Sequence, residues 1–327
     1  MSFRSTIFDF RFRIGKRPFS GRLRALAWVW PLSLLLSGCA PNSHDIVVAY
    51  CAQDQVYAEP IFRDFEKAAG IKVQAVYDSE AVKTVGLANR LLAERSHPQC
   101  DVFWGNEEMR TRQLAAQDVF RSTNAWAAFG YRSRRILINT NQLSLATAPR
   151  SLLDLTNASW RGKIALAYPQ FGTTSTHLHA LRQLWGDAVW EQWCRGLAAN
   201  KALLEEGNSM VVKAVGNGTA WVGLSDSDDV AEGQENGLPL VALPMNSETL
   251  LIPNTVAVIR DAPHPDAAQR LFEYLQQPEI AGRLVAAHAL EGGSASPLPV
   301  STLKVDWALL LRDLDATTAK LNQIFLR

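Results

Sequence analysis

The chain has 327 residues, of which 47% are hydrophobic, and its 33 basic and 32 acidic side chains give a formal net charge of +1 at pH 7. This length is enough for a large hydrophobic core and for two lobes. Since no basic patch stands out after the N-terminal segment, the charge pattern argues against nucleic acid as a partner.

The N-terminal segment has the pattern of an export signal. Within residues 1–24, a single acidic residue, Asp9, stands against seven basic residues: Arg4, Arg11, Arg13, Lys16, Arg17, Arg22 and Arg24. The apolar stretch 25–36 is too short for an ordinary transmembrane helix and has the length of a signal-peptide core. It leads into the sequence LSGC, ending at Cys39, which resembles a bacterial lipobox.

This resemblance implies that residues 1–38 are a lipoprotein signal peptide, that Cys39 is lipidated and that residues 39–45 are a lipidated tether. The protein would then be exported and anchored to a membrane on its periplasmic side. An ordinary signal peptide with an incidental cysteine is the alternative. Cleavage removes a net charge of +6, which changes the net charge of the chain from +1 to −5.

Three further cysteines do not suggest a disulfide framework. Cys51 follows a predicted strand, Cys100 precedes another, and Cys194 lies far from both in the sequence. If the two strands are parallel neighbours, Cys51 and Cys100 lie at opposite ends of the sheet, beyond the reach of a disulfide. We therefore expect buried free thiols.

The first half of the mature chain alternates strands and helices. We expect strands at 46–50, 71–77 and 101–104, with helices at 57–69, from 78–80 to about 94, and after 108. Such a run predicts a parallel sheet with right-handed crossovers. Because ligands bind beyond the carboxyl ends of parallel strands, the loops 51–55, 78–80 and 105–108 are candidate binding loops.

The second half continues the alternation. We expect strands at 135–139, 163–167, 219–224 and 252–259, helices from 173 to about 184 and at 210–216, and a mostly helical remainder. The pattern predicts an α/β protein of two lobes, each a mostly parallel sheet flanked by helices. Lobe I would comprise 46–139 and 253–290, and lobe II 140–252 and 291–327, with hinge crossings near 138–142 and 250–256.

A loop late in the chain concentrates negative charge. Residues 223–229 read GLSDSDD and place Asp226, Asp228 and Asp229 within four positions. Three neighbouring carboxylates repel one another, so water, a helix N-terminus or a cation should compensate them. A ligand-gripping loop and a helix cap, with Ser227 or Asp228 as N-cap, are both consistent with this pattern.

Five segments together resemble the periplasmic ferric-ion-binding proteins of ABC importers, within the wider extracellular solute-binding family. They are VAYCAQ (48–53), FEKAAGIKV (65–73), CDVFWG (100–105), WRGKI (160–164) and GNSMVVKAV (207–215). The similarity covers roughly 46–300. It implies the type II periplasmic binding protein fold, with the ligand in the hinge cleft, and docking on a membrane permease coupled to an ATPase.

The resemblance also implies a metal site, although the ligand types differ. Ferric-binding relatives place two adjacent tyrosines where this chain has Asp228 and Asp229, and many use a histidine where it has Asp54. Glu80 matches their glutamate, and Glu107 lies in the third candidate loop. An all-oxygen set suits Fe³⁺ or another hard cation, taken as transported ligand. It also suits an ammonium or guanidinium group.

Two predicted helix starts suit an anion. Thr173 and Thr174 begin one helix, and Asn208 and Ser209 precede another. Helix N-termini bind phosphate, phosphonate or carboxylate groups, and the resemblance implies a synergistic anion here. Ordinary N-capping by Thr173 and Ser209 is the alternative.

The ligand is therefore either a metal with an anion or one organic molecule, such as an aminoalkylphosphonate or a polyamine. The positions of the acids favour the metal. Four aromatic residues flank the expected cleft, where they would stack on an organic ligand or pack in the core: Tyr50, Trp104, Tyr168 and Phe171. We expect a monomeric binding protein and no enzyme, because no P-loop, nucleophile elbow or zinc signature is present.

Overall fold

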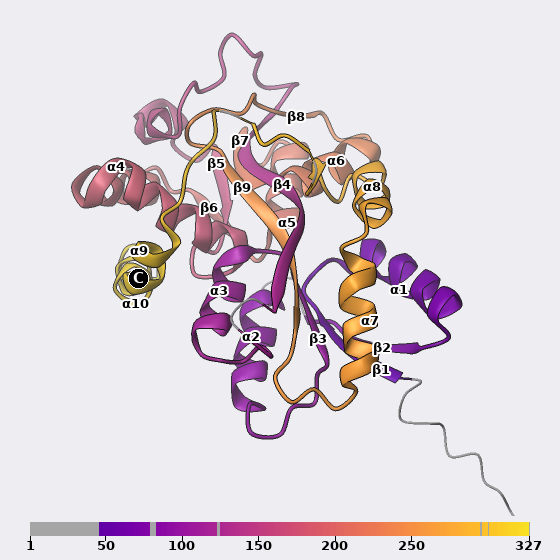
Figure 1. The fold of residues 1–327 in the computed structure, drawn as a ribbon. Helices are drawn as coiled ribbons and strands as arrows, with labels where there is room; N and C mark the ends of the chain where they lie inside the picture. The colour runs from indigo at the N-terminus through magenta and orange to yellow at the C-terminus, as the bar shows by residue number, and fades with distance from the viewer. Residues whose placement is uncertain (1–45, 79–82, 123–124, 295, 300, 327) are drawn as a thin grey trace, which may run out of the picture. The chain divides into compact units, whose positions relative to one another are not determined.

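The computed structural model describes residues 46–78, 83–122, 125–294, 296–299 and 301–326 (Figure 1). The predictions for the signal peptide, the lipidated Cys39, the tether and Glu80 lie outside these residues. Among the described residues, no helix has the length and apolar character needed to cross a membrane.

One mixed sheet connects all the strands. They are β1 (Ile46–Cys51), β2 (Lys72–Val76), β3 (Val102–Gly105), β4 (Trp126–Asn139), β5 (Ile164–Ala167), β6 (Leu203–Glu205), β7 (Val222–Asp226), β8 (Leu240–Ala242), β9 (Leu250–Val258) and β10 (Gly292–Gly293). The order is β2-β1-β3-β9-β4-β7-β5-β6, and β8 and β10 also pair with β4. Strands β2, β1 and β3 are parallel, as are β7, β5 and β6, which confirms the predicted parallel groups.

The long strands β4 and β9 join the two parallel groups. They are antiparallel to each other, β9 also pairs with β3, and the second half of β4 pairs with β7. The predicted strand 135–139 was too short at its N-terminal end, because β4 already begins at Trp126. The passages along β4 and β9 therefore run inside paired strands rather than through loops.

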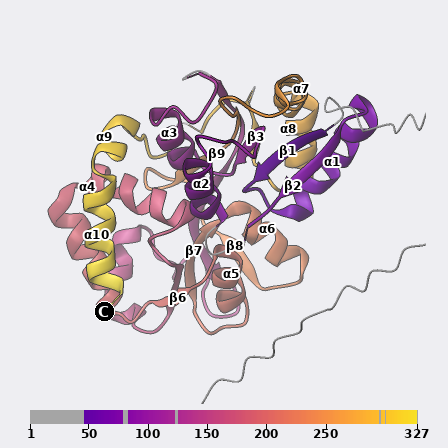
Figure 2. The ribbon, with the colours of Figure 1, turned by 90° about the horizontal axis from the view of Figure 1, so that it is seen from below.

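Helices cover both faces of the sheet. They are α1 (Gln55–Ala69), α2 (Lys83–Ala93), α3 (Glu108–Ala116), α4 (Gly172–Ala199), α5 (Asn208–Gly216), α6 (Ser227–Glu235), α7 (Pro265–Leu275), α8 (Pro278–Ala286), α9 (Trp307–Arg312) and α10 (Leu314–Phe325), with short 3₁₀ turns η2 (Leu152–Thr156) and η3 (Ala158–Trp160). Figures 1 and 2 show α4, α9 and α10 grouped together, away from α1, α7 and α8.

The alternation of strand side chains explains this layering. In β3, Val102 and Trp104 pack with the cluster under α1, α7 and α8, whereas Phe103 packs with α2 and α3. In β5, Ile164 faces the cluster with α4 and α10, and Ala165 faces α5. Because successive strand residues point to opposite faces, a continuous apolar run is covered on both sides.

Two further predictions can be judged here. The three cysteines Cys51, Cys100 and Cys194 are free and buried, as expected. The helix predicted to end near 184 does end there, because Gly186 has non-helical backbone angles, with φ of 75° and ψ of 164°, which only glycine adopts without strain; a second helical segment of α4 then continues to Ala199.

Candidate functional site

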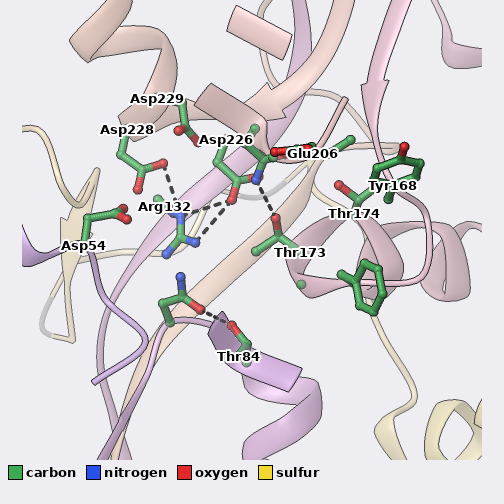
Figure 3. A pocket seen from close by; sticks show the side chains of 16 residues that line it. Asp54, Thr84, Arg132, Tyr168, Thr173, Thr174, Glu206, Asp226, Asp228 and Asp229 are labelled. Carbon is green, nitrogen blue, oxygen red and sulfur yellow. Dashed lines mark hydrogen bonds and ion pairs between the residues drawn. The ribbon is translucent and has the colours of Figure 1, made fainter. Parts of the chain in front are cut away.

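A small cavity lies at the carboxyl ends of β1, β3, β5 and β7, the edge that the parallel pattern predicts. Its volume is about 50 Å³. The lining comes from both parallel groups and includes Asp54, Thr84, Asn106, Arg132, Tyr168, Phe171, Gly172, Thr173, Thr174, Glu206, Gly207, Asn208, Asp226, Asp228 and Asp229 (Figure 3). This is far below the 300–1,000 Å³ typical of organic-ligand pockets, so the cavity has room only for a small ligand.

The acidic loop forms one end of this cavity. Strand β7 ends at Asp226, which is the N-cap of α6, and Asp228 and Asp229 lie in the first turn of that helix. The three carboxylates each offer an oxygen within 4.8 Å of the others, the spacing of a candidate metal centre. The helix N-terminus favours this charge. Neither Ser227 nor Asp228 is the N-cap, because the strand runs two residues further than predicted.

Two buried arginines compensate the loop from within the chain. The Arg132 guanidinium lies 3.2 Å from Asp226 Oδ2 and 3.2 Å from Asp228 Oδ1, and Arg134 Nη1 lies 2.8 Å from Asp226 Oδ1. The exposed fractions of Arg132 and Arg134 are 2% and 0%. Both oxygens of Asp226 are therefore engaged. Figure 3 shows Arg132 directed at Asp226 and Asp228.

Sequence reasoning missed these arginines. Strands are recognised by apolar runs, and arginine is rarely fully buried unless it is paired. A signal was nevertheless present: Arg132 and Arg134 share one face of β4 by the period of two, and the chain carried an uncompensated acidic loop.

The electrostatics of the site hold its groups ionised. Burial alone would lower the pKa of Arg132, but the surrounding carboxylates, above all Asp228 and Asp226, outweigh it and raise that pKa. Burial likewise opposes ionisation of Asp226, yet Arg132 and Arg134 hold the pKa of its carboxyl below the usual range. The buried charges thus exist as pairs, which is the condition under which proteins tolerate them.

The network continues to the starts of α4 and α5. Arg134 Nη1 donates to Asn208 Oδ1 at 2.7 Å, and Asn208 Nδ2 donates to Thr173 Oγ1 at 3.0 Å. The side chains of Thr173 and Asn208 are therefore held by Arg134. The N-caps of α4 and α5 are Phe171 and Gly207, and neither helix has a side-chain cap hydrogen bond, which corrects the alternative of capping by Thr173 and Ser209.

The cavity also receives residues from the other parallel group. Asp54 is the N-cap of α1 and has no side-chain cap hydrogen bond. Thr84 and Asn106 come from the first turn of α2 and the end of β3, and Thr84 Oγ1 donates to Asn106 Oδ1 at 2.7 Å. A second cavity of about 250 Å³ shares Asp54 and Asp229 and continues past Ser209.

Three predicted residues lie elsewhere, which corrects their assignment to the cavity lining. Glu107 is fully buried and caps α3, accepting from Met109 N at 2.6 Å and Arg110 N at 3.0 Å. Burial raises the pKa of its carboxyl. Tyr50 is buried, and its hydroxyl donates to Glu94 at 2.8 Å. Trp104 is a core residue.

These corrections have one physical reason. Trp104 packs edge-on against Phe62 and Phe129, where its ring is removed from water. Tyr50 and Trp104 belong to strands that are covered by helices on both faces, so their side chains point into a core and not beyond the strand end. Tyr168 and Phe171, which follow β5 in a loop, do line the cavity.

His177 is buried near Arg134 and does not line the cavity. Its Nε2 lies 2.7 Å from the carbonyl oxygen of Glu248, and the ring is buried. Burial, assisted by the nearby Arg134 charge, lowers the pKa of His177 to about 3. The imidazole is therefore neutral near pH 7 and does not add to the charge of the site.

A cleft at the carboxyl edge of two parallel groups, lined by acids and helix N-termini, is the architecture of a ligand-binding protein. The chain belongs to the bacterial extracellular solute-binding protein family, whose model matches residues 46–288. It is similar to the major ferric iron-binding protein of Neisseria meningitidis serogroup A, with 25% identity over 283 residues that cover 79% of this chain and 83% of the relative.

Solved structures share the fold. Iron-bound HitA from Pseudomonas aeruginosa superposes with a TM-score of 0.76 at 19% identity, over 86% of this chain and 99% of that one. AfuA from Actinobacillus pleuropneumoniae, with exogenous fructose-6-phosphate bound, superposes with a TM-score of 0.69 at 19% identity, over 85% of this chain and 96% of that one. These likenesses confirm the predicted type II periplasmic binding protein fold.

Proposed function

We propose that this protein is the substrate-binding component of an ABC importer and captures a hard cation, ferric iron or another, together with an oxyanion. The observation that carries the proposal is the set of three carboxylates within 4.8 Å of one another, beside two helix starts without side-chain caps. Acids suit a hard cation, and helix N-termini suit its anion. The ferric iron-binding names of the relatives support the same ligand.

The charge of the site fits this ligand. Asp54, Glu206, Asp226, Asp228 and Asp229 bring five negative charges, and Arg132 and Arg134 return two positive charges. Because Asp226 is engaged by both arginines, Asp54, Asp228 and Asp229 are the proposed ligands from this set. Glu80 remains a proposed ligand from the sequence. A divalent or trivalent cation would offset most or all of the remaining negative charge, and the helix starts would stabilise its anion.

The first experiment is a thermal-shift screen of residues 40–327 with Fe³⁺-citrate, Mn²⁺ and Ca²⁺. A ligand present at 100-fold over its Kd stabilises the fold by about 2.7 kcal/mol, which is readily measured. The expected shift disappears on chelation and in the double variant Asp228→Asn with Asp229→Asn. The matched control is Asp266→Asn with Asp315→Asn, which removes exposed first-turn acids from α7 and α10. A shift that survives in the first double variant contradicts the metal site.

A second candidate is a small organic ligand with an anionic and a cationic end, such as an aminoalkylphosphonate, or a polyamine. It is favoured by Arg132, which already lies among the carboxylates, and by the 250 Å³ cavity that shares Asp54 and Asp229 and would hold the rest of the molecule. The named AfuA structure holds a phosphorylated sugar in the same fold. A thermal shift with 2-aminoethylphosphonate or spermidine, and with no metal, would select this candidate.

The same proposal covers the location, oligomeric state and closure of the binding protein. We infer that it is exported as a lipoprotein through Cys39, acts as a monomer and closes its two lobes about β4 and β9 on its ligand. The lobe boundaries stay those predicted from the sequence. The relatives are named as binding proteins, which supports a role without catalysis.

A further inference from the structure

Thr84 and Asn106 form a polar pair on the side of the cavity opposite to α4 and α5. Their exposed fractions are 3% and 4%, and both line the cavity. They belong to the parallel group of β1, β2 and β3, whereas α4 and α5 belong to the group of β5, β6 and β7. The pair therefore faces the ligand from the other half of the sheet.

Hydrogen bonding fixes the orientation of the Asn106 amide. Thr84 Oγ1 donates to Asn106 Oδ1 at 2.7 Å, so the amide oxygen already has its partner (Figure 3 shows this bond at Thr84). The amide nitrogen carries two N–H donors. Within the part of the chain that the structure describes, no group accepts a hydrogen bond from Asn106 Nδ2. Because Asn106 lines the cavity, these donors are available to an acceptor on the ligand.

The opposite wall also donates. The starts of α4 and α5, at Gly172 and Asn208, have no side-chain cap, and helix N-termini favour negative charge. In a cavity of only about 50 Å³, a small group at the helix starts also lies close to Thr84 and Asn106. That group must accept hydrogen bonds on both sides and carry negative charge.

We propose that Asn106, oriented by Thr84, is the contact from lobe I that recognises the ligand's oxyanion, of the phosphate or phosphonate class. This inference rests on the proposed function but does not depend on which cation accompanies the anion. The carboxylates bind the cation, and Asn106 donates hydrogen bonds to the anion from the opposite lobe. The oxyanion then contacts both lobes, so closure of the lobes depends on the anion as well as on the cation.

The test is isothermal titration of residues 40–327 at pH 7.5 with inorganic phosphate and, separately, 2-aminoethylphosphonate, each with and without saturating Mn²⁺. Asn106→Asp replaces the donor by a negative charge of the same shape, and we expect it to weaken oxyanion binding at least about tenfold. Thr84→Val removes the hydrogen bond that orients the Asn106 amide and should weaken oxyanion binding about threefold. This effect is smaller than the one expected when a charge-assisted hydrogen bond is lost. Asn141→Asp, at an exposed position, is the control and should change nothing.

The outcomes separate this inference from the proposed function. The inference is overturned if the Kd of the oxyanion changes by less than about twofold between the unaltered protein and Asn106→Asp. It is also overturned if the unaltered protein binds neither oxyanion under any condition. Weaker oxyanion binding in Asn106→Asp, without any effect of Mn²⁺, upholds the inference and removes Mn²⁺ as the accompanying cation. Loss only with phosphate, or only with the phosphonate, upholds it and identifies the free or the organic oxyanion as the ligand. Thermal denaturation without ligand checks that each variant is folded.

Discussion

Replacing Arg132 by methionine tests the central electrostatic feature of the site. The change removes the guanidinium between Asp226 and Asp228 and keeps an unbranched apolar stem of similar reach. Removing one partner of a buried ion pair leaves an uncompensated charge and costs about 3–5 kcal/mol. We expect a loss of this size at pH 7.5, because Arg134 still pairs with Asp226 but contributes no pair to Asp228.

The loss should depend on pH. In the unaltered protein the pKa of Asp226 is below its usual value of 3.8, so its contribution to stability is present above that value and is lost only as pH falls through the lower, folded pKa. Without Arg132, Asp226 loses the larger of the two positive charges that lower the pKa of its carboxyl, so that pKa rises. The Asp226 carboxyl then takes up its proton at a higher pH than in the parent, and a second measurement at a pH of about 4.5 tests whether this lessens the cost of the lost pair. The difference between variant and parent should therefore shrink on acidification.

Urea denaturation followed by tryptophan fluorescence measures this difference at both pH values. Arg135→Met is the matched control, because Arg135 lies on the same strand, β4, but pairs with Glu291 where the two side chains are 17% and 26% exposed. A pair of that exposure is worth no more than about 1 kcal/mol. Equal losses in the two variants, or a loss in Arg132→Met that does not change with pH, would refute the buried-pair reasoning.

Three further predictions concern other parts of the chain. The pKa of His177 falls from 6.5 to about 3 on folding, so its contribution to stability is present above pH 6.5 and decreases as pH falls towards 3. About 2 kcal/mol should be lost between pH 7.5 and 5, and denaturation of His177→Gln should lack this loss. Glu107→Ala removes the cap of α3 and should cost about 1–2 kcal/mol in chemical denaturation, whereas Glu107→Gln, which keeps an acceptor oxygen, should cost less. Cys39→Ser should move the protein from the membrane to the soluble fraction on cell fractionation, and its retention there would contradict the lipobox.

The local elements could be predicted because neighbouring residues decide them. The helix from 57 to 69 follows from its apolar spacing, and Gly70 ends it in the left-handed conformation, with φ of 68°. The apolar runs of β1, β3 and β5 indicated strands covered on both faces, and strands covered on both faces belong to parallel sheets. The carboxyl edge then followed as the place of the cavity.

The partners of the acidic loop could not be predicted in this way. Arg134 lies directly opposite Asp226 in the β4–β7 ladder, although the two residues are 92 positions apart in the chain. Strand register between such distant segments depends on the packing of both lobes, and no local pattern encodes it. The same holds for Thr84 and Asn106, which meet only because α2 and β3 are adjacent in the fold.

By itself, then, the sequence determined the order of the longer strands and helices, the edge of the sheet that carries the cavity and most of the acidic residues there, because short-range periodicity and chain direction specify these. Only the tertiary structure decided that Arg132 and Arg134 neutralise part of that charge, that Glu107, Tyr50 and Trp104 are structural, and that Asn106 faces the cavity. These properties depend on burial and on contacts between distant segments, which exist only after the two halves of the sheet have come together.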